Sequence, residues 1–297
     1  MKRVLTAVVL IPLVLLALFL APNWLFAVLV GAVAVLAAVE YLSLAAGYGY
    51  EPFRFLTYLL IVTFYGIILW ATGSPSPNGE YVLITMVFFF TLSPFVFLCA
   101  GMSREDMRSV LPGAAVSYVA LPYLGFSLAC LVIMRIMPAG WLLVLITFFV
   151  IWVGDTAAYY VGRAFGKIKF APRISPKKTW EGAIASAVAS IIVGILLVEF
   201  ATPISRGLTT IHLLHAPLYF EDTPMWITAL VALAINIAGQ IGDLLESLIK
   251  RGANVKDSGS LLPGHGGILD RIDALLFAAP IALVLFGALR EYFLQVP

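Results

Sequence analysis

Charged residues are scarce in this sequence. Only 11% of the 297 residues are Asp, Glu, Lys or Arg, whereas 62% are hydrophobic. A soluble domain carries about 25% charged residues, so this composition excludes an ordinary soluble protein and predicts an integral membrane protein. No polar block is long enough to form a separate soluble domain of ordinary size.

Cysteine and histidine are scarce as well. The two cysteines, Cys99 and Cys130, both lie in apolar runs, and we interpret them as thiols that fill the core rather than as a disulfide or a metal-binding pair. No cluster of cysteine and histidine indicates a zinc site. His212 and His215 fall in a loop and are interpreted as ordinary surface residues.

Long apolar runs make up most of the chain. Because a spanning helix needs about 20 apolar residues, the runs predict an all-α, polytopic membrane protein with about nine transmembrane helices. The predicted spans are residues 4–21, 24–46, 55–72, 81–100, 113–137, 141–162, 179–201, 225–250 and 269–293. We expect the first run to be retained, because no clear signal-peptide cleavage site follows it. Pro122 predicts a kink in the fifth span.

Basic residues are distributed unevenly between alternate loops. If the N-terminus lies inside, the outside segments contain only Arg135, Arg206 and Arg290. The inside segments contain Lys2, Arg3, Arg54, Arg104, Arg108, Arg163, Lys167, Lys169, Arg173, Lys177, Lys178, Lys250, Arg251 and Lys256. This asymmetry predicts an N-in, C-out topology, with the loops 163–178 and 251–268 on the cytoplasmic face of the inner cell membrane.

Most of the residues that could carry chemistry lie in the last four predicted spans and their loops. We therefore predict a membrane scaffold of about five spans at residues 1–137 and a catalytic membrane domain of about four spans at residues 138–297. Both cytoplasmic loops fall in the second part.

The eighth predicted span carries a row of polar residues. Asn236, Gln240, Asp243 and Ser247 are four, three and four residues apart, so they share one face of a helix. A polar seam between helices explains Asn236 and Gln240. It explains Asp243 less well, because a carboxylate inside a membrane costs a few kcal/mol unless it is paired or solvated.

The ninth predicted span begins with two further carboxylates, Asp270 and Asp273, which share a face. Ordinary helix capping is a serious alternative for both. Carboxylates from two helices are, however, a usual way to hold Mg²⁺. The sequence thus predicts that Asp243, Asp270 and Asp273 bind Mg²⁺, and it leaves a second, monovalent cation open. Asp155 is a further carboxylate expected to be buried. Glu40, in the second span, has no comparable site residues near it in the sequence and is interpreted as structural or as a helix contact.

Two loops could bind phosphate groups. Residues 252–267 are rich in glycine, which lets several backbone N–H groups point at one anion, and they contain Lys256 and His265. In the other loop, Ser175 and Pro176 predict an N-cap and the first residue of a helix. A helix N-terminus beside Lys177 and Lys178 would bind phosphate, although a simple positive-inside anchor is the alternative.

The segment from Ser247 to Asp273 resembles the signature of phosphatidate cytidylyltransferases, also called CDP-diacylglycerol synthases. The matching motifs are Ser247-x-x-Lys250-Arg251, Lys256-Asp257, Pro263-Gly264-His265-Gly266-Gly267 and Asp270-Arg271-x-Asp273. Residues 175–182 and the pair Asp155-Thr156 also resemble flanking motifs of that family. The first 130 residues match only as generic membrane helices.

The resemblance implies that CTP and phosphatidic acid are converted to CDP-diacylglycerol and pyrophosphate, for phospholipid synthesis, at the inner face of the membrane. It implies catalytic roles for Asp243, Asp270, Asp273, Lys250, Arg251 and His265. It implies substrate binding by Ser175, Lys177, Lys178, Thr179, Glu181, Ser247, Lys256, Asp257, Gly266, Gly267, Arg271 and Asp155. We expect no nucleic-acid partner and leave a homodimer open.

Two other functions compete with this interpretation. A CTP-dependent lipid kinase, such as a dolichol or phytol kinase, resembles the family in part. A transporter would also place charges within spans, but no internal repeat is evident. A CDP-alcohol phosphotransferase is disfavoured, because its D-G-x-x-A-R motif is not found.

Overall fold

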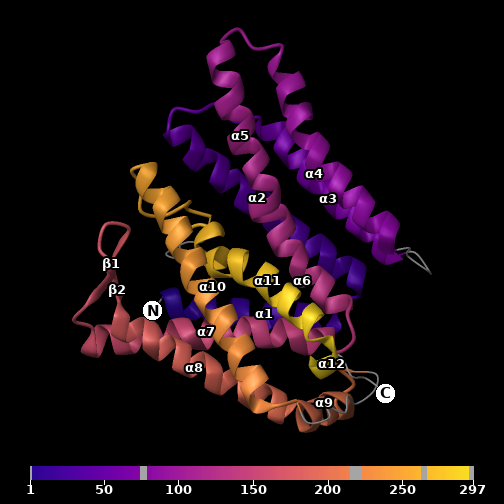
Figure 1. Ribbon diagram of the computed structural model, residues 1–297, viewed down its shortest axis with the longest axis vertical. Helices are drawn as coiled ribbons and strands as arrows, with labels where there is room; N and C mark the ends of the chain where they lie inside the picture. The colour runs from indigo at the N-terminus through magenta and orange to yellow at the C-terminus, as the bar shows by residue number, and fades with distance from the viewer. Residues whose placement is uncertain (1, 74–78, 215–222, 262–265, 294–297) are drawn as a thin grey trace. The chain divides into compact units, whose positions relative to one another are not determined.

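The computed structural model describes residues 2–73, 79–214, 223–261 and 266–293, and it is almost entirely helical (Figure 1). Within these residues, eight helices are long and apolar enough to cross a membrane. They are α2 (Asn23–Gly47), α3 (Arg54–Gly73), α4 (Gly79–Gly101), the continuous helix Met107–Ile136, α7 (Gly140–Phe165), α8 (Trp180–Glu199), α10 (Met225–Gly252) and α11 (Leu269–Ala288).

The predicted fold class is confirmed: this is an all-α, multi-pass membrane protein. Each predicted span from the second to the ninth has a counterpart among these helices. The first predicted span corresponds to α1 (Lys2–Leu20). Its stretch Leu10–Leu20 is apolar but is not among the eight helices of spanning length. The exact number of spans and the N-in, C-out orientation stay predictions.

The chain forms two compact units that are interleaved in sequence. Unit 1 comprises the described residues of Met1–Leu10, Ala21–Val132 and Ile249–Ile272. Unit 2 comprises those of Ile11–Leu20, Ile133–Leu248 and Asp273–Pro297. The predicted division into a scaffold and a catalytic domain after residue 137 concerns function, and it stays a prediction.

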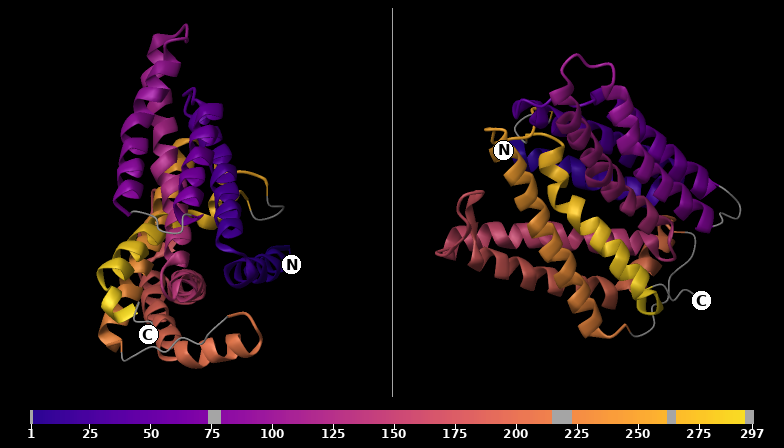
Figure 2. Two further views of the ribbon diagram at one scale, coloured as in Figure 1. Left: turned by 90° about the vertical axis from the view of Figure 1, so that its right-hand side faces the viewer. Right: turned by 45° about the horizontal axis from the view of Figure 1, so that its top comes forward.

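Unit 1 is built on helix pairs. α2 packs on α3, and α4 packs on α5 (Val110–Ala120) (Figures 1 and 2). Gly31 lets α2 approach the ring of Tyr65, because a Cβ atom there would lie 3.0 Å from that ring. A six-residue π-helical turn, η2 (Leu121–Phe126), follows α5 and leads into α6 (Ser127–Ile136).

Pro122 lies in this π-helical turn, within a continuous helix, and the kink predicted there stays a prediction. Proline lacks the N–H that an α-helix requires and clashes with the carbonyl group of the preceding turn. The π-helical turn relieves this conflict, and the Ser127 hydroxyl donates a hydrogen bond to the Pro122 carbonyl oxygen at 3.1 Å. Cys99 and Cys130 are both free thiols. Cys130 is buried, as predicted, whereas Cys99 is exposed, so the prediction that it fills the core was wrong.

Unit 2 is organised by α7 and α8, which lie side by side along their lengths (Figures 1 and 2). Small residues permit this close approach, as is usual between membrane helices. A Cβ atom at Gly154 would lie 2.6 Å from the Ser190 hydroxyl and 2.8 Å from that of Ser186, and one at Gly194 would lie 2.8 Å from Ala232. A short α9 (Ala201–Thr210) follows α8.

A small antiparallel hairpin connects α7 to α8. Its strands are β1 (Lys169–Ala171) and β2 (Ser175–Thr179). The prediction that Ser175 caps a helix beginning at Pro176 was therefore wrong. A residue that precedes proline is disfavoured in the α region, and Ser175 instead begins a strand. The helix begins at Trp180, and Thr179 is its N-cap residue, with its hydroxyl accepting a hydrogen bond from the Gly182 N–H at 3.3 Å.

Candidate active site

A seam of polar side chains joins the helices of unit 2. Asn236, on α10, donates hydrogen bonds of 2.8 Å to the hydroxyls of both Ser186 and Ser190 on α8. It also accepts one from Gln240 at 2.6 Å. The Ser190 hydroxyl in turn donates to the carbonyl oxygen of Val150 on α7 at 2.7 Å. The seam predicted for Asn236 and Gln240 is confirmed, and it fixes the face of α10 that carries Asp243.

One helical turn further along α10, the Asp243 carboxylate forms an ion pair with Lys178. The two charged atoms are 2.8 Å apart, and both side chains are partly buried. The Lys178 ammonium group also donates to the Gln240 carbonyl oxygen at 3.4 Å, and Ser247 donates to Asp243 at 3.4 Å. The hairpin thus delivers a lysine from β2 to a carboxylate on a transmembrane helix.

Asp243 belongs to a cluster of carboxylates that we call the acidic group: Asp155, Asp243, Glu246 and Asp273. The Asp243 carboxylate lies close enough to those of Asp155 and Asp273 to repel both, and Glu246 also repels Asp273. Glu246 is fully buried. The backbones of α10 and α11 meet closely here, because a Cβ atom on Gly242 would lie 2.6 Å from the Asp273 carbonyl oxygen.

The donor chemistry of the acidic group fits Mg²⁺. Among the described residues, no three His, Cys, Asp or Glu side chains form a ready-made metal cage. Mg²⁺ does not require one, since it is usually held by one or two carboxylates together with waters and substrate phosphates. Asp243 is paired with Lys178 and is close to the carboxylates of Asp155 and Asp273, and a divalent cation would reduce the repulsion among these three groups. The assignment of Mg²⁺ to Asp243, Asp270 and Asp273 stays a prediction.

Unit 1 contains a second charged network, built from the signature segment. Lys250, near the C-terminal end of α10, forms an ion pair of 2.5 Å with Asp270 in the first turn of α11. Both side chains are about nine-tenths buried. The other oxygen of Asp270 accepts hydrogen bonds from the Ser258 N–H and hydroxyl, each at 2.9 Å, and from the Gly267 N–H at 2.8 Å. All these donors precede α11, so Asp270 holds the loop to the start of the helix, and helix capping by Asp270 stays an alternative.

Glu40 completes the network of unit 1. Its carboxylate is buried and accepts hydrogen bonds from the backbone N–H groups of Ile268 and Leu269 at 3.0 and 2.8 Å. It also accepts one from the Ser258 hydroxyl at 3.0 Å. The expectation that no comparable site residues lie near Glu40 was wrong, because its partners come from the signature segment more than 200 residues away. The interpretation of Glu40 as a structural residue or a helix contact agrees with these bonds.

The other predicted site residues lie nearby in sequence but have less defined surroundings. The Arg251 guanidinium group donates to the Val255 carbonyl oxygen at 3.1 Å. Gly266 has a φ of +78°, and a Cβ atom there would collide with the Asp270 carboxylate, so glycine is required. Among the predicted site residues, those with exposed side chains are Arg251, Lys256, Asp257, Arg271, Lys177 and Asp155. The expectation that Asp155 is a buried carboxylate was therefore wrong. His265, Pro263 and Gly264 lie outside the described residues, and so does His215.

Residues at the base of the hairpin have structural partners. Glu181, in the first turn of α8, accepts hydrogen bonds from the backbone N–H groups of Lys167 and Ile168 at 3.0 and 3.2 Å. Thr179 is buried and caps α8, and the ring of Phe170 packs on that of Trp180 at a centroid distance of 4.5 Å. These contacts hold the strand that carries Ser175, Lys177 and Lys178. Substrate binding by any of them stays a prediction.

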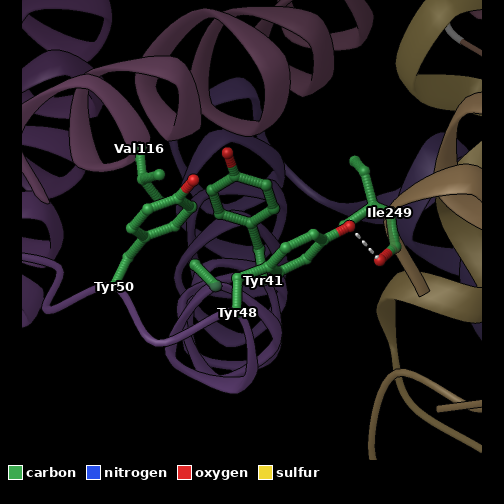
Figure 3. Close-up of a pocket in the computed structure, with 6 residues that line it drawn as sticks. Tyr41, Tyr48, Tyr50, Val116 and Ile249 are labelled. Atoms are coloured by element: carbon green, nitrogen blue, oxygen red, sulfur yellow. Dashed lines mark hydrogen bonds between the residues drawn. The ribbon is translucent and has the colours of Figure 1, made fainter. Parts of the chain in front are cut away.

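A cavity of about 170 Å³ in unit 1 is lined by Tyr41, Ala45, Tyr48, Tyr50, Val116 and Ile249 (Figure 3). The rings of Tyr48 and Tyr50 are stacked, and the Tyr48 hydroxyl donates to the Ile249 carbonyl oxygen at 2.7 Å. Desolvation and the neighbouring Tyr50 raise the pKa of Tyr48 above its ordinary value. None of the described residues that line the cavity is charged, and this lining does not suit a phosphate group.

Sequence reasoning missed Glu40 and Ser258. A signal for Glu40 was present, because an ionisable residue within an apolar span is a functional candidate by default. Ser258 had no such signal, since a serine in a polar loop is ordinary. Its importance follows from the fold, which buries it between two carboxylates.

Comparison with known proteins identifies the relatives of this sequence. The model of the Cytidylyltransferase family matches residues 1–289. A protein of Haemophilus influenzae named phosphatidate cytidylyltransferase is 32% identical, and the match covers 94% of this chain and 96% of that protein. Proteins of the same name from Brucella suis biovar 1 and Staphylococcus haemolyticus are 41% and 34% identical over 65% and 71% of this chain. The match spans 64% of the length of the Brucella relative and 73% of the Staphylococcus relative.

Proposed function

The chain belongs to the Cytidylyltransferase family, and from this membership we propose that it transfers the cytidylyl group of CTP to phosphatidate. The products would be CDP-diacylglycerol and pyrophosphate. The observation that carries the proposal is the acidic group on transmembrane helices of unit 2, with Lys178 paired to Asp243. Charges of both signs at this density inside a membrane protein indicate a site for anionic substrates and a cation.

The reaction itself needs little acid–base help. The phosphate monoester of phosphatidate is already anionic near neutral pH, so its oxygen can attack without a strong general base. The attack forms a bond from this oxygen to the α-phosphorus of CTP and breaks the bond from that phosphorus to the departing pyrophosphate. The obstacle is the repulsion between two anions, which positive groups must reduce.

Lysines that are already paired with carboxylates suit this task. Lys178 and Lys250 are each held by one carboxylate, which fixes the ammonium group before substrate arrives. Substrate phosphates would share these lysines with Asp243 and Asp270, and Lys177, Arg251 and Lys256 would add positive charge. When bound by Asp243, Asp270 and Asp273, with help from Asp155, Mg²⁺ would neutralise charge on the phosphates.

The setting of the reaction belongs to the same proposal. We infer that the protein lies in the inner membrane and that its site faces the cytoplasm, because the basic loops favour that side. Phosphatidate would reach the site from the bilayer and CTP from the cytoplasm. A nucleic-acid partner is not expected, and a homodimer stays open.

Position-specific labels in CTP test the proposal. Purified protein in lipid micelles is given phosphatidate with CTP labelled on either the α- or the γ-phosphorus. The proposal predicts that the α-label enters the lipid, that the γ-label leaves in pyrophosphate, and that a chelator of Mg²⁺ stops both. Entry of the γ-label into a lipid would instead indicate a CTP-dependent lipid kinase, and entry of neither label would contradict the proposal.

A further inference from the structure

The carboxylate of Glu40 lies at the centre of a network formed by two parts of the loop between α10 and α11, residues 253–268, which we call the signature loop. Ser258 lies in the described part before residue 262, Ile268 ends the described part after residue 265, and Leu269 begins α11. All three donate hydrogen bonds to Glu40. Glu40 itself is on α2, remote in sequence from the loop and from α11. One side chain of the N-terminal region therefore ties together two parts of the segment that resembles the family signature.

The bonds to Glu40 satisfy N–H groups at the start of α11 that have no partner within that helix. The first N–H groups of a helix have no partner within it, and a negative charge at this end is stabilised by the helix dipole. Leu269 is the first residue of α11, and Ile268 precedes it. A carboxylate with two oxygens accepts from both N–H groups at once, which a carboxamide cannot do without turning its own NH₂ toward a donor.

Two glycines show how closely the loop fits around this carboxylate. A Cβ atom on Gly259 would lie 2.6 Å from Glu40, and one on Gly267 would collide with the same group. Any larger side chain at either position would push the loop away from Glu40. The contact with Glu40 therefore depends on glycine at these two positions as well as on the hydrogen bonds.

Ser258 connects Glu40 to two of the proposed site residues, Asp270 and Lys250. The Ser258 hydroxyl lies 3.0 Å from Glu40 and 2.9 Å from Asp270, while Asp270 is paired with Lys250. A hydroxyl has one proton, so it donates to one carboxylate at a time or is shared between them. Glu40, Ser258, Asp270 and Lys250 therefore form one continuous chain of contacts.

We propose that Glu40 is a positioning residue, which holds the signature loop and the start of α11 in the arrangement that binds the substrates. The inference rests on the proposed function, because Lys250 and Lys256 are assigned there to phosphate binding. If Glu40 is neutralised, the loop spends less time in the competent arrangement. Apparent affinity then falls in proportion to the competent fraction, so KM rises for each substrate that the loop contacts.

The test compares Glu40→Gln with Glu51→Gln in the full-length protein. Glu51 is an exposed carboxylate of the same unit, 4.0 Å from Arg104, and it has no contact with the loop in the described residues. The proposal predicts that Glu40→Gln raises the KM for CTP or for phosphatidate by about 5-fold or more. It also predicts faster hydrogen exchange of the Ile268 and Leu269 amides. Glu51→Gln should change neither quantity.

A second variant protects the test against a folding failure. Gly259→Ala keeps the carboxylate and disturbs the same contact from the loop side, so it should raise the same KM. Unchanged KM values in both variants, with any lost activity matching the lost folded protein, would show that Glu40 is merely structural. That result would leave the proposed function intact, whereas an inactive wild-type protein would remove the function instead.

Discussion

Carboxylates in the membrane-spanning segments of this protein have two kinds of partner. Glu40 and one oxygen of Asp270 accept hydrogen bonds from backbone N–H groups and from the Ser258 hydroxyl, so they shape the signature loop. The other oxygen of Asp270 is paired with Lys250, and Asp270 is also one of the proposed Mg²⁺ ligands, so it has both kinds of partner. Asp243 has an ammonium partner in Lys178 and close carboxylate neighbours. The first kind stabilises structure, whereas the second leaves the negative charge that a cation site requires.

At the same scale, Asn236 should be important for stability rather than for chemistry. Its amide takes part in three side-chain hydrogen bonds, so Asn236→Ala removes them together and leaves their partners buried. We expect a loss of about 1 kcal/mol or more in the free energy of unfolding, since hydrogen bonds between membrane helices are individually modest.

Unfolding in mixed micelles measures this loss for Asn236→Ala. Thr63→Ala is the control, because Thr63 is exposed and bonds within its own helix; equal losses in both variants would contradict the role of the seam.

At the scale of elements, the hairpin between α7 and α8 is the part that sequence reasoning misjudged. Serine followed by proline is a common helix start, but it fits an extended strand equally well. Pairing with Lys169–Ala171 selects the strand. The next residue that could cap a helix is Thr179, and its extended backbone conformation, with φ of −130°, is the one that an N-cap residue adopts.

The cap therefore gives a prediction for α8. Thr179→Ala removes the acceptor of the Gly182 N–H and should lower the free energy of unfolding by about 1 kcal/mol. Thr179→Ser retains the hydroxyl and should lose less. Thermal unfolding compares the two, and hydrogen exchange at Gly182 reports on the cap directly. If the serine variant is as unstable as the alanine variant, the cap prediction is wrong. The stabilisation would then come from packing of the Thr179 methyl group, which lies near Gly166.

At the scale of the whole molecule, the sequence predicted the helices well. Apolar runs of spanning length are a strong signal, since every backbone group in a bilayer must be bonded within its own helix. The predicted run 225–250, for example, corresponds to α10 (Met225–Gly252), and the run 141–162 to α7 (Gly140–Phe165).

The partners of individual residues were much harder to predict. Helical periodicity placed Asn236, Gln240 and Asp243 on one face, but it could not identify Ser186, Ser190 and Lys178 as their partners. Nor could it connect Glu40 to Leu269, because that contact depends on how α2 packs beside the start of α11. Pattern within a helix is local, whereas a site is assembled from contacts between helices.

The central claim is that the carboxylate of Asp243 supports Mg²⁺-dependent cytidylyl transfer, and turnover of Asp243→Asn as a function of Mg²⁺ concentration tests it most directly. The control is Glu199→Gln, which neutralises an exposed carboxylate at the end of α8. With folding verified by thermal unfolding, the account predicts that Asp243→Asn loses about 10²-fold or more in turnover at every Mg²⁺ concentration, while the control behaves like the wild type. Near-normal turnover of Asp243→Asn with an unchanged Mg²⁺ dependence would contradict the account.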